Sequence, residues 1–310
     1  MGARLHQRGH DVVLVARGAH HDAIRAGGLR LVAPEESVVL PIPVEAAPDA
    51  VAYRPDDVVL LGVKSQDTAG VLAALQRAAP PDVAVVCVQN GVANERAALR
   101  CFPNVYGVCV MLPAVHLEPG VVEANAAPVT GILDVGRVPG SVDPVAEGVS
   151  AAFASSTFVS EPRPDIMRWK YGKLLNNLGN AIDALAGRAA RGGDLAARAR
   201  AEGEAALAAA GIDVITREED ATRRGDTLPW GGRAASGRAG SSSWQSLARG
   251  TGAIEADYLN GEIVLLGRLH GVPTPVNATL QRLAGEAARA AAEPGSWSAD
   301  ELAREVERSG

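Results

Sequence analysis

A lysine and two asparagines follow one another at helical spacing in the second half of the chain. Lys173 and Asn177 are four residues apart, and Asn180 lies near the end of the same stretch. Residues four apart share one face of a helix, so an ammonium group and side-chain amides would line one surface. An ammonium can donate a proton to a carbonyl oxygen that is being reduced, and amides can orient the substrate. A solvated helix edge is the alternative, and it is the commoner use of a single lysine.

A second set of polar residues follows later in the chain. Ser243 stands at the start of a predicted helix, where its hydroxyl could cap the helix or bind a carboxylate. Glu255 is expected on a helix whose apolar stripe is formed by Leu259, Ile263 and Leu266. That placement predicts a partly buried carboxylate beside a cation such as a lysine. An ordinary surface glutamate is the alternative.

Short apolar runs alternate with amphipathic segments in the first half of the chain. The expected strands are 12–16, 58–63, 83–88, 105–112, 131–136 and 157–159, with a hairpin at 29–32 and 38–40. The expected helices are 20–26, 68–79, 92–100 and 143–154. Continuous apolar strands that alternate with helices predict a parallel sheet covered on both faces.

The proline-rich stretch 161–164 ends the strand pattern, and only helical patterns follow. The expected helices are 165–187, 194–210, 218–224, 244–270, 275–292 and 298–308. We therefore predict two domains, an α/β domain at 1–162 and an all-helical domain at 163–310. The Gly-, Ser- and Arg-rich segment 225–243 is expected to be a loop or a flap beside a site.

Composition excludes several classes of protein. The net charge of −6 argues against a general nucleic-acid binder, which needs a basic surface. No uncharged run reaches the length of a membrane helix, and no signal peptide is evident, so we expect a cytoplasmic protein. Cys87, Cys101 and Cys109 form no CxxC pair, and we expect no metal site. A homodimer is possible, because a helical domain could dimerise.

The start of the sequence bears on the cofactor. An open α/β sheet binds nucleotides at the carboxyl ends of its strands, beside a glycine-rich loop after the first strand. No G-x-G-x-x-G precedes the segment 2–10, which reads as the end of a first helix. Either the sheet binds no dinucleotide, or the sequence begins after that loop. In the second case the neighbours of the missing central strand should be exposed. Arg17 ends the strand 12–16, where an arginine suits the 2′-phosphate of NADP.

Five stretches in order resemble the ketopantoate reductase (2-dehydropantoate 2-reductase) family. They are the segment 9–18 (Gly-His-Asp-Val-x-Leu-Val-Ala-Arg-Gly), Val63-Lys64, the segment 89–95 (Gln-Asn-Gly-Val-x-Asn-Glu), Lys173-Leu174-x-x-Asn177, and Ser242-Ser243 with the segment 255–261 (Glu-x-Asp-Tyr-x-Asn-Gly). The resemblance implies a Rossmann-type N-terminal domain, whose first strand and glycine loop are absent here, and an all-α C-terminal domain. It also implies NADPH-dependent reduction of a 2-keto acid, most simply 2-dehydropantoate in pantothenate biosynthesis.

The resemblance also implies roles for individual positions. Lys173 matches the general acid, and Glu255 matches the acid that positions this lysine and contacts substrate. The substrate-binding positions are Asn90, Asn177 and Ser243, to which we add Asn180. The cofactor-binding positions are Arg17, Lys64 and Asn90.

One departure from the family pattern leaves the substrate open. Ala181 stands where the family often carries a further substrate-binding asparagine, and Asn180 falls one residue early. A related reductase of another 2-keto acid therefore remains an alternative. So does a catalytically impaired ligand-binding protein, because the dinucleotide loop is absent.

Overall fold

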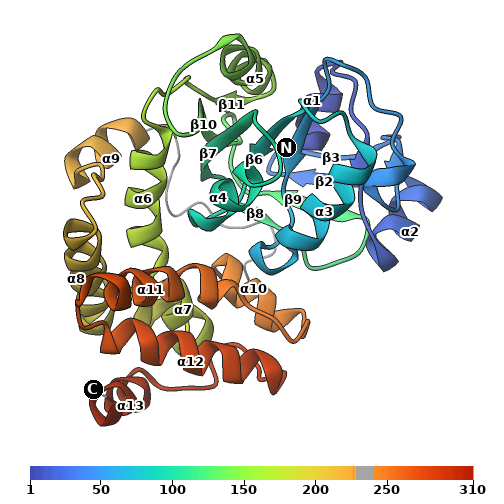
Figure 1. Ribbon diagram of the computed structural model, residues 1–310. Coiled ribbons are helices and arrows are strands. Elements are labelled where there is room, and N and C mark those ends of the chain that lie inside the picture. The colour runs from blue at the N-terminus through green and yellow to red at the C-terminus, as the bar shows by residue number, and fades with distance from the viewer. Residues whose placement is uncertain (226, 228–239, 310) are drawn as a thin grey trace. The chain divides into compact units, whose positions relative to one another are not determined.

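The chain folds into two compact units, shown in Figure 1. The computed structural model describes residues 1–225, 227 and 240–309. The first unit holds 1–89, 94–167 and the helix at 217–224; the second holds 90–93, 168–216 and the described residues from 240 onward. The predicted boundary at 162/163 lies near one crossing between the units, but the chain crosses between them more than once.

The first unit is an α/β structure of Rossmann type. Its strands are β1 (Leu14–Val15), β2 (Leu29–Ala33), β3 (Glu36–Leu40), β4 (Val44–Glu45), β5 (Val58–Leu61), β6 (Ala84–Cys87), β7 (Val105–Met111), β8 (Ala114–Val115), β9 (Val121–Ala124), β10 (Gly131–Arg137) and β11 (Phe158–Val159). Its helices are α1 (Gly2–Gln7), α2 (Gly18–Gly27), α3 (Thr68–Ala78), α4 (Ala93–Leu99), α5 (Pro144–Ser155) and α9 (Arg217–Arg224), with short 3₁₀ turns η1 (Pro48–Ala50) and η2 (Ser65–Asp67).

The main sheet has the strand order β11-β10-β7-β6-β5. Strands β5, β6 and β7 are parallel, as predicted, whereas β10 runs antiparallel to β7. The predicted parallel sheet therefore holds for β5, β6 and β7, and the strand expected at 131–136 joins it antiparallel as β10. The reason is the connection, because β7 returns through the short strands β8 and β9 without a crossover helix, and a parallel return would need one.

The central strand β6 is buried on both faces, which explains its continuous apolar run. Val86 packs on one face with Val108, Leu133 and Phe153 of α5. Val85 and Cys87 pack on the other face with Leu72 and Leu75 of α3. Successive side chains of a strand point to opposite faces, so a strand covered by helices on both sides must be apolar throughout. The predicted α/β layering is confirmed.

The remaining strands form two smaller sheets, β3-β2-β9-β8 and β1-β4. The predicted hairpin is confirmed, since β2 and β3 pair antiparallel with Leu29 opposite Leu40. Strand β5 is an edge of the main sheet, and β1 pairs with β4 alone among the described residues. Val13, Val15 and Val58 are exposed on or beside these two strands.

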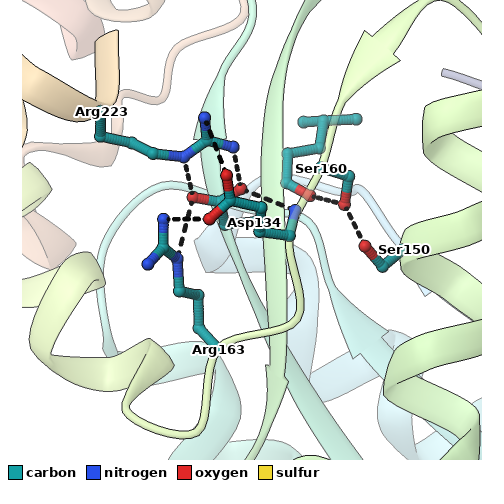
Figure 2. A network of polar contacts seen from close by, with 7 residues as sticks. Asp134, Ser150, Ser160, Arg163 and Arg223 are labelled. Carbon is teal, nitrogen blue, oxygen red and sulfur yellow. Dashed lines mark hydrogen bonds and ion pairs between the residues drawn. The ribbon is translucent and has the colours of Figure 1, made fainter.

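A buried carboxylate ties α9 to the main sheet (Figure 2). Asp134 of β10 is 1% exposed and accepts hydrogen bonds from Arg223 of α9, at 2.7 Å from Nε and 2.5 Å from Nη2. The Glu161 backbone N–H donates to the same carboxylate at 2.9 Å, and Arg163 Nε lies 3.4 Å away. A bidentate guanidinium with additional donors is the arrangement that compensates a buried charge best. It explains why a helix distant in sequence belongs to the first unit.

The second unit is helical in the residues described. Its helices are α6 (Ile166–Asn177), α7 (Asn180–Ala186), α8 (Asp194–Ala209), α10 (Ser242–Ala248), α11 (Asn260–His270), α12 (Pro275–Arg289) and α13 (Ala299–Ser309), with 3₁₀ turns η3 (Arg188–Gly192) and η4 (Glu255–Tyr258).

Two of the predicted helices are interrupted. The segment 165–187 divides into α6 and α7, with a break at residues 178 and 179. The segment 244–270 divides into α10, η4 and α11, because Gly250 and Gly252 adopt positive φ angles of 60° and 72° after α10. Glu255 therefore lies in a 3₁₀ turn and not on the predicted continuous helix. Periodicity alone does not detect such breaks, since the apolar stripe resumes in phase.

The cysteines and the lengths of the helices bear on two expectations from the sequence. In the described part of the chain Cys87, Cys101 and Cys109 form no disulfide; Cys87 and Cys109 are buried, and Cys101 is at intermediate exposure. Within the described part of the chain, no helix combines the length and the apolarity needed to cross a bilayer.

Candidate active site

The end of α6 carries the first predicted site residues. Lys173 is partly exposed, and Asn177 follows one helical turn later with 4% of its surface exposed. The Nδ2 atom of Asn177 is buried and has no hydrogen-bond acceptor among the described residues. A buried amide donor without an acceptor costs about 1–3 kcal/mol. Such an atom is expected where a bound molecule supplies the acceptor.

Asn180 is buried at the start of α7, and its side-chain oxygen accepts a hydrogen bond from Arg191 Nη2 at 2.8 Å. Burial lowers the pKa of Arg191, while the charge of Asp183 opposes that shift. The Asp183 carboxylate also accepts the backbone N–H of Ser241 at 2.6 Å. In this arrangement Asn180 and Asp183 fix the start of α10. The substrate-binding role predicted for Asn180 thus competes with a positioning role.

Ser243 lies in the first turn of α10 and is buried, at 2% exposure. The helix is capped by Ser241, whose Oγ accepts the Trp244 N–H at 3.3 Å. The alternative in which Ser243 caps the helix is therefore wrong, because the N-cap position belongs to Ser241, two residues before Ser243. Helix α10 packs against α7, so Ser243 and Asn180 belong to neighbouring elements.

Glu255 begins the turn η4 and is 5% exposed, which confirms the predicted burial. A cation near it is Arg249, which follows α10. Burial lowers the pKa of Arg249, and the negative charge of Glu255 opposes this shift. The sequence predicted a cation such as a lysine beside Glu255, and Arg249 is a further cation that sequence reasoning missed, because it follows α10 ahead of the turn at Gly250 and Gly252.

Backbone packing joins η4 to the other elements of the second unit. Asn260, directly after η4, donates from Nδ2 to the carbonyl oxygen of Leu178 at the end of α6, at 3.1 Å. Gly91, at φ +80°, lies so close to η4 that an added Cβ would be 3.0 Å from the carbonyl oxygen of Tyr258. Asn90 is thus held beside η4. Asn90, Asn177 and Glu255 therefore lie in the same unit, on segments that contact one another or adjoin a shared segment.

The residues on either side of the loop 90–93 form a buried polar network in the first unit. Gln89 Nε2 donates to the Val63 carbonyl and to Thr68 Oγ1, both at 2.9 Å. Thr68 donates in turn to Asn94 Oδ1 at 2.7 Å, and Asn94 Nδ2 donates to Ser65 Oγ at 3.1 Å. This network fixes both ends of the loop that carries Asn90. It also fixes the turn η2, which follows Lys64.

Arg17 and Lys64, the predicted cofactor residues of the first unit, follow β1 and β5 respectively. Arg17 is 76% exposed and forms an ion pair with Asp67, with 2.9 Å between Nη2 and Oδ2. These positions are the carboxyl ends of strands, where open α/β sheets bind nucleotides. The guanidinium and the free N–H groups at the start of α2 fit a phosphate. No cluster of three or more metal-ligating side chains occurs among the described residues.

The fold and these polar residues define a two-unit protein, with a Rossmann-type α/β unit and a helical unit. Comparison with family models matches ketopantoate reductase PanE/ApbA over residues 1–140 and its C-terminal model over residues 165–288. The chain belongs to the ketopantoate reductase family.

Curated relatives support the same family. The chain is 30% identical to the 2-dehydropantoate 2-reductase of Archaeoglobus fulgidus, over 91% of this chain and 92% of the relative. It is also 30% identical to the enzyme of that description from Halobacterium salinarum, over 85% and 86% of the two chains. Curated members of the family are thus oxidoreductases that reduce a small keto acid.

Solved structures show the same fold. A PanE/ApbA family ketopantoate reductase from Ralstonia eutropha JMP134 has a TM-score of 0.77 at 28% identity, covering 94% of both chains. A D-mandelate dehydrogenase solved with NADH and anilino(oxo)acetate has a TM-score of 0.78 at 22% identity, again covering 94% of each chain. At that identity the second comparison concerns the fold alone.

Proposed function

We propose that this protein reduces a 2-keto acid with NADPH, with 2-dehydropantoate as substrate and pantoate as product. The observation that carries the proposal is the unpaired amide of Asn177, buried one helical turn after Lys173. A 2-keto acid offers carboxylate and keto oxygens, which are the acceptors that this amide lacks. The family relationship supports the same class of substrate.

The proposed chemistry assigns one task to each residue. Lys173 holds the proton that passes to the keto oxygen as that oxygen gains negative charge. Asn177 and Ser243 bind the substrate, and Glu255 positions Lys173 and contacts the substrate. Arg17, Lys64 and Asn90 would hold the dinucleotide, which supplies the hydride when bound.

Two features of this chain bear on its substrate preference, which the family relationship does not determine. Ala181 offers no hydrogen bond where the family often carries an asparagine, so another branched 2-keto acid could be the better substrate. The segment 225–243, expected to close over the substrate, lies largely outside the described residues. Substrate preference therefore has to be measured across a series of 2-keto acids that includes 2-dehydropantoate.

The test is NADPH oxidation by the protein produced from its complete gene. We expect turnover with at least one branched 2-keto acid, and Lys173→Ala should lower kcat by about 10²–10⁴-fold with little change in Tm. Lys170→Met is the matched control, because it removes a lysine of the same helix that is 3% exposed. This variant should lower Tm clearly, and it should lower kcat much less than Lys173→Ala does. Absence of NADPH oxidation with every 2-keto acid would refute the proposal.

A second candidate is a ligand-binding protein without reductase activity. It is favoured by the ion pair of Arg17 with Asp67, which engages the guanidinium predicted to bind the 2′-phosphate. Calorimetric titration of residues 1–310 with NADPH separates the two candidates. Tight binding would rule out the version that binds no dinucleotide.

A further inference from the structure

The guanidinium of Arg17 is engaged by a carboxylate of the same unit. Arg17 follows β1 after one intervening residue, and Asp67 ends the turn η2 at the position just before α3. Their side chains form an ion pair, with 2.9 Å between Nη2 and Oδ2. Asp67 does not use its side chain to cap α3. Its carboxylate is therefore directed to Arg17 and not to the helix that it precedes.

The two residues favour opposite forms of the adenosine ribose. A guanidinium after this strand suits a 2′-phosphate, whereas a carboxylate suits a ribose with a free 2′-hydroxyl, which can donate a hydrogen bond to it. A phosphate that reaches the guanidinium of Arg17 would also lie close to the Asp67 carboxylate. The two negative charges repel, and the carboxylate competes for the same N–H donors.

We propose that Asp67 is a cofactor-specificity residue that lowers the preference for the 2′-phosphorylated dinucleotide. The protein would then accept either NADPH or NADH as its cofactor. This inference rests on the proposed function, and it changes what is expected of Arg17. The arginine alone predicts selectivity for NADPH. The ion pair predicts a protein that discriminates only weakly between NADPH and NADH.

The exposure of the pair sets the size of the effect. Arg17 is 76% exposed and Asp67 is 31% exposed. Exposed ion pairs are weak, so a bound phosphate can still draw Arg17 away from Asp67. The carboxylate charge remains near the phosphate after such a movement. We therefore expect Asp67 to change the relative affinity for the two dinucleotides by about 3–10-fold, an effect that added salt should reduce.

The experiment measures binding directly, by fluorescence titration of the full-length protein with NADPH and with NADH. Asp67→Asn should lower the Kd for NADPH by about 3–10-fold and leave the Kd for NADH within about twofold. Arg17→Gln should raise the Kd for NADPH alone. Competition with adenosine 2′,5′-bisphosphate and with AMP should show the same pattern, which assigns the effect to the 2′-phosphate.

Asp11→Asn is the matched control. Asp11 is an exposed aspartate of the same unit, and it pairs with Arg54 at 2.9 Å. This control makes the same change in net charge and should leave the ratio of the two Kd values unchanged. Equal effects of Asp67→Asn on both dinucleotides, or an equal change in the ratio with Asp11→Asn, would overturn the inference while leaving the proposed function intact. Failure of the wild-type protein to bind either dinucleotide would overturn both.

Discussion

The burial and hydrogen bonding of Asn177 indicate a ligand-binding role and not a structural one. Its amide is buried, and its Nδ2 atom has no acceptor among the described residues. A side chain selected only for stability would not retain such an atom, because replacing it with an apolar group of similar shape removes the desolvation cost. Binding sites commonly lower the stability of a protein in this way.

We predict that Asn177→Leu raises Tm, or leaves it unchanged, while it weakens substrate binding. The free energy of unfolding should not fall by more than about 0.5 kcal/mol, and KM for the 2-keto acid should rise by at least about 10-fold. Thermal unfolding and steady-state kinetics measure the two effects. Asn277→Leu is the control, because Asn277 Nδ2 donates to the Ala199 carbonyl and to Glu202 Oε2, and its Oδ1 accepts from Asn260 Nδ2. That variant should unfold at a lower temperature. A fall in Tm for Asn177→Leu similar to that of the control would indicate a structural role.

At the scale of elements, two histidines join helix α2 to the loop before β9. His20 Nδ1 accepts the backbone N–H of Gly120 at 2.9 Å. Its ring centroid lies 4.3 Å from that of His116, whose Nδ1–H donates to the Val121 carbonyl at 2.9 Å. Protonation of His20 would remove the lone pair that accepts the Gly120 N–H. Burial lowers the pKa of His20, and the neighbouring His116 lowers it further.

We predict that this contact makes the first unit less stable in mild acid. The folded-state pKa of His20 lies below its unfolded value of 6.5, so the unfolded chain binds the proton more readily. The contribution of His20 is therefore fully present above pH 6.5 and is lost as the pH falls toward the folded-state pKa. His20→Gln keeps an acceptor for Gly120 but does not titrate, so Tm should fall less between pH 7.5 and about pH 5.5 than in the wild type. Identical pH profiles for the two proteins would contradict this prediction.

At the scale of the whole molecule, the path of the chain between its two units depends on a buried ion cluster. Helix α9 lies between α8 and α10 in sequence, and both of these helices belong to the second unit. It nevertheless belongs to the first, where Arg223 is paired with Asp134 (Figure 2). Removing one partner of a buried pair leaves an uncompensated charge, which is more damaging than removing both.

We predict that Asp134→Asn destabilises the first unit by about 3–5 kcal/mol, because two arginines lose their shared carboxylate. The double variant Asp134→Leu/Arg223→Met should recover a large part of this loss. Chemical denaturation measures both, and limited proteolysis should show faster cleavage near α9 in the single variant only. Asp143→Asn provides a partly exposed comparison, since Asp143 pairs with Arg137 at 2.7 Å and its side chain is 19% exposed. An equal loss in both single variants would show that burial of Asp134 is unimportant.

The sequence by itself determined the fold class, most element positions and the family. Apolar runs such as 83–88 can be satisfied only by strands covered on both faces, and the spacing of Lys173 and Asn177 places them on one helix face whatever surrounds that helix. Those are local properties, which depend on the chain within a few residues.

Tertiary structure alone decided which groups are paired. It placed Arg249 near Glu255, Arg191 on Asn180 and Asp67 on Arg17, and it left the Asn177 amide without an acceptor. It also reversed β10 and returned α9 to the first unit. Each of these depends on glycine turns or on contacts between distant segments, whose energies no local pattern contains.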